Sequence, residues 1–405
     1  MRFRLLEAWL HDLRFSMRIL VKNPTLTLIA VLTLALGIGA NTAIFSVINA
    51  VLLRPLPFSR PEQLVVAYER RTQQEVSRGL VNPADFLVWQ KQNHVFATLA
   101  AYTDAFFNLT GGGESERLHG VINTSRLLTT LGRHPMLGRD FSFEDDQPGA
   151  ADVVILSHRL WQRRFAGDKA IIKRMIMLNG APVQVVGVMP PGFYFPNKET
   201  ELRMSRTLDT PMRNRRGAHF LNVIGRLKDG ITLAQAQAGM DPLAADLARQ
   251  FPATNAGHGV NLFSLVDETH SPYRRSLIVL FGAVTLVLLI ACVNVANLSL
   301  TQAAARHREL TLRVALGASR GRLMRLLLSE SLLLSLTGGT LGLLLALGGV
   351  QLLPALAPGN LPRLDEVNID MRVLSFTLLA VLLTSAICSL LPAWQATGLD
   401  CNDAL

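Results

Sequence analysis

The residues best suited to partner binding lie in one charged stretch, Arg306–Arg320, between two long apolar runs. Glu309 and Arg313 stand four positions apart with the acid first, which favours an ion pair on one face of a helix. Gly317 is a natural C-terminal stop for that helix, and Ser319 is suited to cap a second helix after it. The stretch therefore predicts a short charged helix, a kink and a longer helix. Two interpretations stay open: a hinged element that binds a partner and transmits its movement, or an anchor whose basic residues only fix orientation.

The other residues that could do chemistry form no recognisable catalytic or metal site. Glu144–Asp146 precedes a proline and is typical of a solvated loop, and no Gly-x-x-x-x-Gly-Lys-Ser/Thr run for binding ATP occurs in the sequence. Histidines are frequent between Arg54 and Arg275, but no two have the spacing of a helix-borne metal site: His94, His119, His134, His158, His219, His258 and His270. We therefore predict no catalytic residue, no metal and no cofactor, and expect that the protein is not an enzyme.

Four uncharged stretches must position these residues. The 405-residue chain is 49% hydrophobic and 17% charged, well below the roughly 25% charge of a soluble domain. Each stretch exceeds the ~20 apolar residues with which a helix crosses a bilayer, and helices satisfy their own backbone polar groups in lipid. The stretches are Pro24–Leu53, Ser276–Ala305, Ser331–Pro362 and Val373–Leu399. We predict four transmembrane helices, the first of them an uncleaved helix rather than a signal peptide.

Basic residues set the expected orientation. Arginines and lysines are in excess in the first 23 residues and again between the second and third spans, which marks both segments as cytoplasmic. Both termini are then cytoplasmic and Arg54–Arg275 is extracytoplasmic. Much of the net charge of +10 is thus a topology signal, so we expect membrane lipids rather than nucleic acid as partners.

The predicted fold class is an α-helical membrane protein with four transmembrane helices and a large mixed α+β extracytoplasmic domain inserted between helices one and two. The expected segments are a cytoplasmic amphipathic helix (1–23), transmembrane helices (24–53, 276–302, 331–354 and 373–397), the extracytoplasmic domain (54–275), a cytoplasmic loop (303–330) and a cytoplasmic tail (398–405).

Local patterns predict several elements of the inserted domain. Asn179-Gly180 is a strong hairpin turn between two strands, and Thr232 with Gln235 forms a capping box for a helix that runs to about Gln250. Further expected elements are strands at Val153–Leu156, Met175–Leu178, Val183–Val188 and His219–Leu227, and a helix at Arg159–Phe165.

Small and amide residues in the spans are expected to serve helix packing. Gly37 and Gly39 in the first span, and Gly338 and Gly342 in the third, permit close helix approach, either within one subunit or between two. Asn294 and Asn297 in the second span are costly in lipid unless bonded, so each is expected to make an interhelical hydrogen bond.

The run Arg308–Arg320 resembles the signature of the MacB/FtsX-like ABC transporter permease family. Ala35–Ser46, Leu53–Pro57, Asp85–Trp89, Leu156–Phe165 and Val186–Phe193 are similar to the acidobacterial-type duplicated permeases within it. The resemblance runs from about Leu13 to Leu405, but duplicated members hold two such units and this sequence holds one. It therefore leaves open a single-copy protein that dimerises or half of a longer protein.

The resemblance implies a permease subunit in the bacterial inner membrane. An ABC ATPase on a separate chain would engage a coupling site formed by Arg306, Glu309, Leu310, Arg313, Leu316 and Gly317, and its closure would move the MacB-like periplasmic domain. A homodimer, or a heterodimer with a second permease unit, and a periplasmic partner are also implied. The alternative is an unpowered membrane-anchored binding or scaffold protein that acts through its external domain.

Overall fold

The computed structural model describes residues 14, 16–18, 20–111, 113–206, 216–305, 320–356 and 367–397. The predicted 1–23 helix lies mostly outside these residues, and the 398–405 tail lies wholly outside them. Two compact units emerge: a helical unit (1–54 and 273–405) and a unit formed by Pro55–Pro272, here called the inserted domain.

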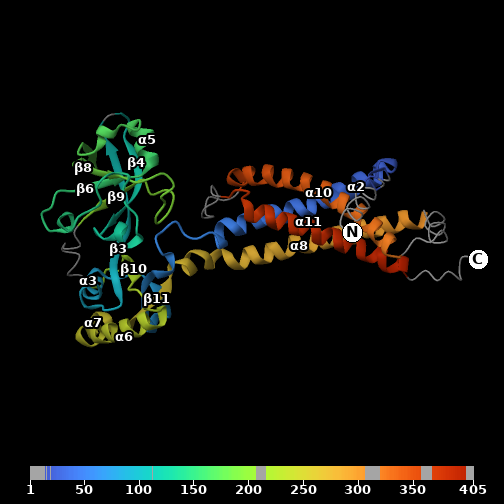
Figure 1. Cartoon of the computed structure of the whole chain (residues 1–405). Helices are drawn as coiled ribbons and strands as arrows, with labels where there is room; N and C mark the ends of the chain where they lie inside the picture. Colours follow the sequence, from blue (N-terminus) through green and yellow to red (C-terminus); the bar gives the residue numbers. More distant parts are fainter. Residues whose placement is uncertain are drawn as a thin grey trace, which may run out of the picture. The chain divides into compact units, whose positions relative to one another are not determined.

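Four helices in the described residues are long and apolar enough to cross a membrane, over Pro24–Leu53, Leu265–Thr301, Leu328–Leu352 and Met371–Ser389. The helices themselves are α2 (Pro24–Ile48, continued by a π-helical turn over Asn49–Leu53), α8 (Leu265–Ala305), α10 (Arg320–Leu356) and α11 (Met371–Thr397) (Figure 1). Because α8 begins at Leu265, its first turns precede the apolar run that predicted it.

Apolar side chains from all four helices form the core of the helical unit. Leu34 and Ile38 of α2 meet Val295 of α8, Leu334 of α10 and Val381 of α11. Further along α2, the rings of Phe45 and Phe376 stack with centroids 4.0 Å apart. Such contacts, rather than hydrogen bonds alone, hold helices together in a bilayer, where lipid is as apolar as the side chains.

The inserted domain contains one eleven-stranded sheet in the order β11-β1-β10-β3-β4-β9-β6-β8-β5, with β2 added to β1 and β7 added to β3 and β8. The strands are β1 (Leu64–Arg71), β2 (Val76–Gly79), β3 (Phe96–Thr110), β4 (Glu116–Asn123), β5 (Leu137–Gly138), β6 (Val153–Leu156), β7 (Met175–Leu178), β8 (Ala181–Val188), β9 (Leu202–Ser205), β10 (Asn222–Leu227) and β11 (His258–Ser264). Pairing is antiparallel except for β4–β9 and β6–β8. The domain's helices are α3 (Pro83–Gln92), α4 (Leu127–Leu131), α5 (His158–Phe165), α6 (Leu233–Gln250) and α7 (Pro252–Asn255).

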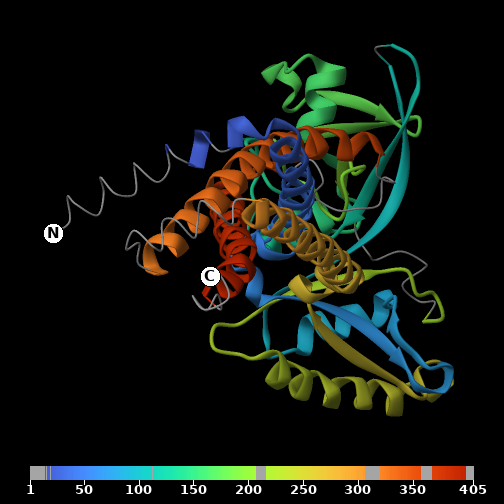
Figure 2. The same cartoon turned by 90° about the vertical axis from the view of Figure 1, so that its right-hand side faces the viewer.

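Alternation along β1 gives the sheet two buried faces. Val65 and Ala67 pack with α3 and α6 on one face, while Leu64 and Val66 pack with α4 on the other. Figure 2 shows α6, in olive, lying along the strands at this end of the sheet. A third core lies under α5 at the far end of β3, where Trp161 packs among β6, β8 and β9.

Most local predictions for this domain are confirmed. Strands β6, β7 and β8 and helices α5 and α6 lie where the sequence places them, and Thr232 and Gln235 form the capping box. Asn179 and Gly180 both have positive φ, at 53° and 79°, as their hairpin turn requires. The strand predicted from His219 begins only at Asn222, so His219 lies before the strand, and its side chain contacts the buried Glu69 carboxylate.

Candidate functional site

The six residues predicted to couple the permease to an ATPase all lie in the segment 306–319, outside the described residues. They are Arg306, Glu309, Leu310, Arg313, Leu316 and Gly317. The structure describes the helices on either side: α8 up to Ala305 and α10 from Arg320. The segment therefore connects α8 to α10 along the sequence.

The predicted packing glycines lie at helix–helix contacts inside one copy of the chain. A Cβ on Gly338 of α10 would lie 2.8 Å from the Leu34 Cβ of α2, and one on Gly37 of α2 would lie 2.9 Å from the Leu288 Cδ1 of α8. Gly39 and Gly342 are in equally close contact across α2 and α10. The glycines thus set how closely α2 approaches its neighbours.

Asn41, rather than the two asparagines predicted from sequence, bonds between helices. Its Nδ2 donates to the Val284 carbonyl of α8 at 2.9 Å, and the Thr285 hydroxyl donates to its Oδ1 at 3.1 Å. Asn41 stands in an uncharged span just as Asn294 and Asn297 do, so the same signal marked all three positions. Sequence alone does not show which of them faces a neighbouring helix.

Asn294 and Asn297 remain exposed on α8, and within the described part of the chain neither side chain makes a hydrogen bond. The buried positions of this stretch are Ala291, Cys292, Val295 and Ala296, which turn towards the other helices. The expected interhelical bonds are therefore not formed within one copy, since the helical period places both amides beside the packed face rather than on it.

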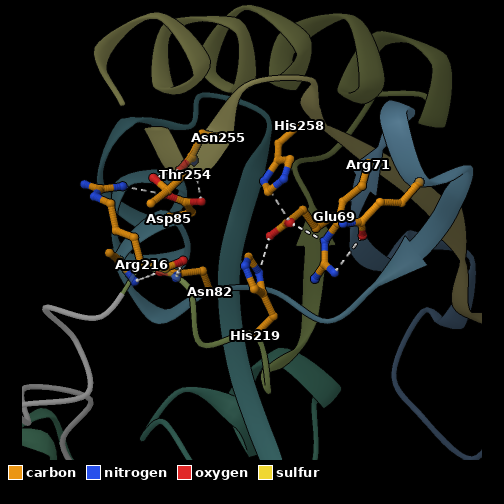
Figure 3. A network of polar contacts seen from close by, with 11 residues as sticks. Glu69, Arg71, Asn82, Asp85, Arg216, His219, Thr254, Asn255 and His258 are labelled. Carbon is orange, nitrogen blue, oxygen red and sulfur yellow. Dashed lines mark hydrogen bonds and ion pairs between the residues drawn. The ribbon is translucent and has the colours of Figure 1, made fainter. Parts of the chain in front are cut away.

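The inserted domain contains a buried polar network around Glu69 that sequence reasoning missed (Figure 3). The Glu69 side chain is only 2% exposed, and its carboxylate accepts from Arg71 Nε at 2.9 Å. His219 Nδ1 lies 2.8 Å from Oε2, and His258 Nδ1 lies 3.0 Å from Oε1. One carboxylate thus joins β1, the start of β11 and the segment before β10. The histidines are far apart in sequence, so their spacing carried no signal.

A second buried carboxylate, Asp85 at the start of α3, lies beside this network (Figure 3). It accepts from Arg216 Nη1 and from Asn255 Nδ2, both at 2.7 Å. Burial raises the pKa of Asp85, although the amide and the guanidinium oppose that rise. The Arg216 guanidinium also lies 3.4 Å from the centroid of the Phe251 ring. Asp85 therefore ties α3 to α7 and to the residues before β10.

These two networks are suited to structure rather than catalysis. Both carboxylates are held by several protein groups, although His258 Nδ1, 3.0 Å from Glu69 Oε1, makes no hydrogen bond of good geometry to a described residue, and neither network contains a nucleophile. Among the described residues, no group of three or more His, Cys, Asp or Glu could hold a metal ion. The networks join the sheet end formed by β11, β1 and β10 to α3 and α7.

Two family models match the chain. Residues 27–243 match the MacB-like periplasmic core domain, and residues 281–400 match the FtsX-like permease C-terminal region. The first match includes α2 and most of the inserted domain, and the second includes most of α8 together with α10 and α11.

The curated relatives and the solved structures share low sequence identity with this chain. The macrolide export ATP-binding/permease protein MacB of Bdellovibrio bacteriovorus is 25% identical over 218 residues, which are 53% of this chain and 33% of that protein. The pyoverdine export ATP-binding/permease protein PvdT of Pseudomonas aeruginosa is 25% identical over 276 residues, 66% of this chain and 39% of that protein. This chain therefore spans well under half the length of these relatives. The periplasmic region of MacB from Actinobacillus actinomycetemcomitans aligns with 52% of this chain and 92% of its own, at 15% identity and a TM-score of 0.37.

Proposed function

This chain belongs to the MacB/FtsX-like permease family, and we propose that it is the permease subunit of an ABC-type transporter. In this proposal an ATPase on a separate chain hydrolyses ATP, and the permease passes the resulting movement to its inserted domain. The work done is efflux or another form of envelope transport. The chain itself performs no covalent chemistry.

One observation carries the proposal: an FtsX-like permease region follows a MacB-like core domain, and among the described residues one apolar helix precedes the inserted domain and three follow it. The names of the relatives join an ATP-binding part to a permease part. The present sequence has no P-loop motif, and we propose that the ATP-binding part is a separate chain.

The proposed orientation puts both termini in the cytoplasm of a bacterial cell and Pro55–Pro272 outside the inner membrane. Arg14, Arg18 and Lys22 precede α2, and a cluster of arginines separates α8 from α10 in the sequence. Lysines and arginines in short loops near the ends of membrane helices favour the cytoplasmic side for those loops. This orientation also agrees with a core domain whose family description is periplasmic.

The proposed coupling site is the stretch that contains Glu309 and Arg313. An ATPase bound there would pull on α8 and α10, which flank the stretch. Strand β11 ends at Ser264 and α8 begins at Leu265, so no loop separates the sheet from the membrane helix. Movement of α8 therefore has a short covalent route to the inserted domain. Such a transmission needs two helix arrangements that ATPase binding favours unequally.

The test is purification of the tagged full chain from its native membrane in mild detergent, followed by identification of retained ATPases and measurement of their ATP hydrolysis. We expect a co-purified ABC ATPase with the unchanged chain and at least a tenfold loss with Glu309→Lys. Glu62→Lys, the same substitution at an exposed position of the inserted domain, is the matched control and should retain the ATPase. Equal retention by both variants would refute the coupling site, and a folded chain that never retains an ATPase would favour the unpowered scaffold.

We further propose that the exposed face of α8 packs against a second permease unit. Most of α8 between Ile278 and Asn297 is exposed, and one set of its exposed positions has the three- and four-residue spacing of a helix pairing seam: Val279, Ala283, Leu286, Ile290, Val293 and Asn297. An amide both donates and accepts, so Asn294 and Asn297 of one copy complement the same residues of another across a two-fold axis. Asn297 lies four residues, about 6 Å along the helix, before Thr301, where the apolar span of α8 ends.

Cysteine crosslinking tests this face. In a background with Cys292, Cys388 and Cys401 replaced by alanine, we expect Asn297→Cys to form a crosslinked dimer on mild oxidation in the membrane. Leu344→Cys, at an exposed position of α10, is the control and should stay monomeric. Equal crosslinking at both positions, or none at Asn297→Cys with two different crosslinker lengths, would exclude the α8 interface.

A further inference from the structure

A pocket of about 490 Å³ opens beside the N-terminus of α5 in the inserted domain. The first turn of α5, the turn Pro190–Tyr194 after β8, and residues Lys198 and Thr200 before β9 form its walls. The proposed transport function uses none of these residues. Its volume lies in the range of pockets that hold small organic molecules, ~300–1,000 Å³.

The pocket is cationic. Arg159, Arg163 and Lys198 line it, and no acidic side chain is among its lining residues. Two carboxylates outside the lining pair with the arginines. Glu201, 8% exposed, lies 3.1 Å from Arg159 Nη2 and 2.9 Å from Arg163 Nη2, and Glu116 lies 2.5 Å from Arg163 Nη1. Glu201 thus orients both guanidinium groups. Each guanidinium has five N–H donors, so both keep donors for a further anion.

A buried cation adds to the positive potential beneath the pocket wall. Arg203 is 0% exposed, and its guanidinium lies 4.6 Å from the centroid of the Phe193 ring, which lines the pocket. Its Nη2 donates to the Phe195 carbonyl, whereas its Nε and Nη1 have no hydrogen-bond partner in the described part of the chain. Burial lowers the pKa of Arg203 to about 9, so the group still carries its charge at neutral pH.

The N-terminal turn of α5 contributes a further attraction for anions. Ser157 caps the helix by accepting from the Leu160 N–H, which leaves the first-turn N–H groups of His158 and Arg159 without intrahelical acceptors. Both residues line the pocket. The positive end of the helix dipole therefore points the same way as the three side-chain charges.

The remaining wall is apolar and aromatic. Pro190, Pro191 and Phe193 line it, together with Tyr194, whose side chain is 40% exposed. The Lys198 Nζ lies 5.8 Å from the centroid of the Tyr194 ring, so the cationic and aromatic walls meet there. A lone inorganic ion would leave most of the pocket empty and this wall uncovered.

We propose that the pocket binds a small amphipathic anion. Its carboxylate or phosphate group lies among Arg159, Arg163 and Lys198, and its apolar or aromatic body lies against Tyr194 and the two prolines. This proposal is independent of the ATPase, because it concerns a site within the inserted domain alone.

The test is ligand-observed ¹⁹F NMR on the full chain in lipid nanodiscs. The probes are 4-fluorophenyl phosphate and 4-fluorobenzoate, with uncharged 4-fluorobenzyl alcohol for comparison. We expect saturable binding of an anionic probe with a Kd of about 1 mM or tighter, which is reasonable for a molecule of this size. The probe with the lower Kd identifies phosphate or carboxylate as the preferred group.

Matched variants locate the binding. The double variant Arg159→Gln/Lys198→Gln should weaken binding at least tenfold. The control Arg164→Gln/Lys173→Gln also removes one arginine and one lysine, but both lie outside the pocket lining, so it should leave binding unchanged. Tyr194→Ala should weaken binding of the two aromatic anionic probes several-fold. The affinity for inorganic phosphate, measured by its competition with a bound probe, should stay unchanged. The proposal fails if no anionic probe saturates, if the uncharged probe binds equally well, or if both double variants, still folded by thermal unfolding, behave alike.

Discussion

Gly39 of α2 and Gly342 of α10 meet backbone to backbone. A Cβ on Gly39 would lie 2.8 Å from the Gly342 carbonyl oxygen, and one on Gly342 would lie 2.9 Å from the Gly39 nitrogen. Real Cβ atoms essentially never come this close to another atom, so this approach requires glycine at both positions. It brings the two helix backbones together over a whole turn. α2 and α10 therefore act as one mechanical unit in the proposed permease.

Gly342→Ala should destabilise the helical unit, although alanine favours helix formation more than glycine does. The added methyl meets backbone atoms of α2 that cannot rotate away, and overpacking of this kind costs about 1–3 kcal/mol. Thermal unfolding in detergent measures the effect. Gly348→Ala is the control on the same helix, because nothing lies within 4 Å of its Cβ position. A similar change in Tm for both variants would contradict the close approach.

Glu69→Gln should loosen the end of the sheet formed by β1, β10 and β11. The amide keeps the shape but removes the negative charge shared by Arg71, His219 and His258. Removing one member of a buried ion pair costs about 3–5 kcal/mol, and the lower end applies because the three partners keep partial exposure.

Hydrogen–deuterium exchange is the measurement for Glu69→Gln, since it reads β10 and β11 separately from the membrane helices. We expect faster exchange in peptides from these strands and unchanged exchange in α2. Glu62→Gln, at an exposed position, is the control. Unchanged exchange in β10 and β11 would show that the carboxylate charge does not hold these strands.

Arg203→Met should leave the stability of the inserted domain unchanged or raise it. The arginine is fully buried without a carboxylate partner, and apolar replacement of buried charge is often neutral or stabilising by about 1–4 kcal/mol. The same variant should weaken the anionic probes of the α5 pocket. A marked fall in Tm together with unchanged probe binding would show that Arg203 serves folding and not the pocket.

Tyr68→Phe should flatten the loss of stability at alkaline pH. Burial and the nearby Glu268 carboxylate raise the pKa of Tyr68 to about 12, from 10.0. The folded state thus keeps this proton while the unfolded chain releases it, so stability is lost as pH rises from about 10 to about 12. Tm measured from pH 9 to 12 should fall less steeply for Tyr68→Phe. Tyr194→Phe, at an exposed tyrosine, is the control and should follow the unchanged chain. An equal slope of Tm against pH for all three proteins would show that deprotonation of Tyr68 does not contribute to the alkaline loss of stability.

Sequence predicted those parts of the fold that depend on neighbours in the chain. The turn at Asn179 and Gly180 and the cap at Thr232 follow from local backbone preferences, and the structure places both as predicted. The predicted start of β10 was wrong by three residues, since the strand begins at Asn222 rather than at His219. Its pairing with β3 begins there, opposite Tyr102, and no local pattern contains that register.

The sequence by itself determined the four apolar helices, the inserted domain and the family, because hydrophobic length and motif are properties of contiguous residues. Only the tertiary structure decided that Asn41 faces α8 while Asn294 stays exposed. It alone brought His219 and His258 to Glu69 and placed the cations of α5 beside Lys198. The physical reason is that helix rotation and strand order set these contacts, and both depend on packing across the whole unit rather than on spacing along the chain.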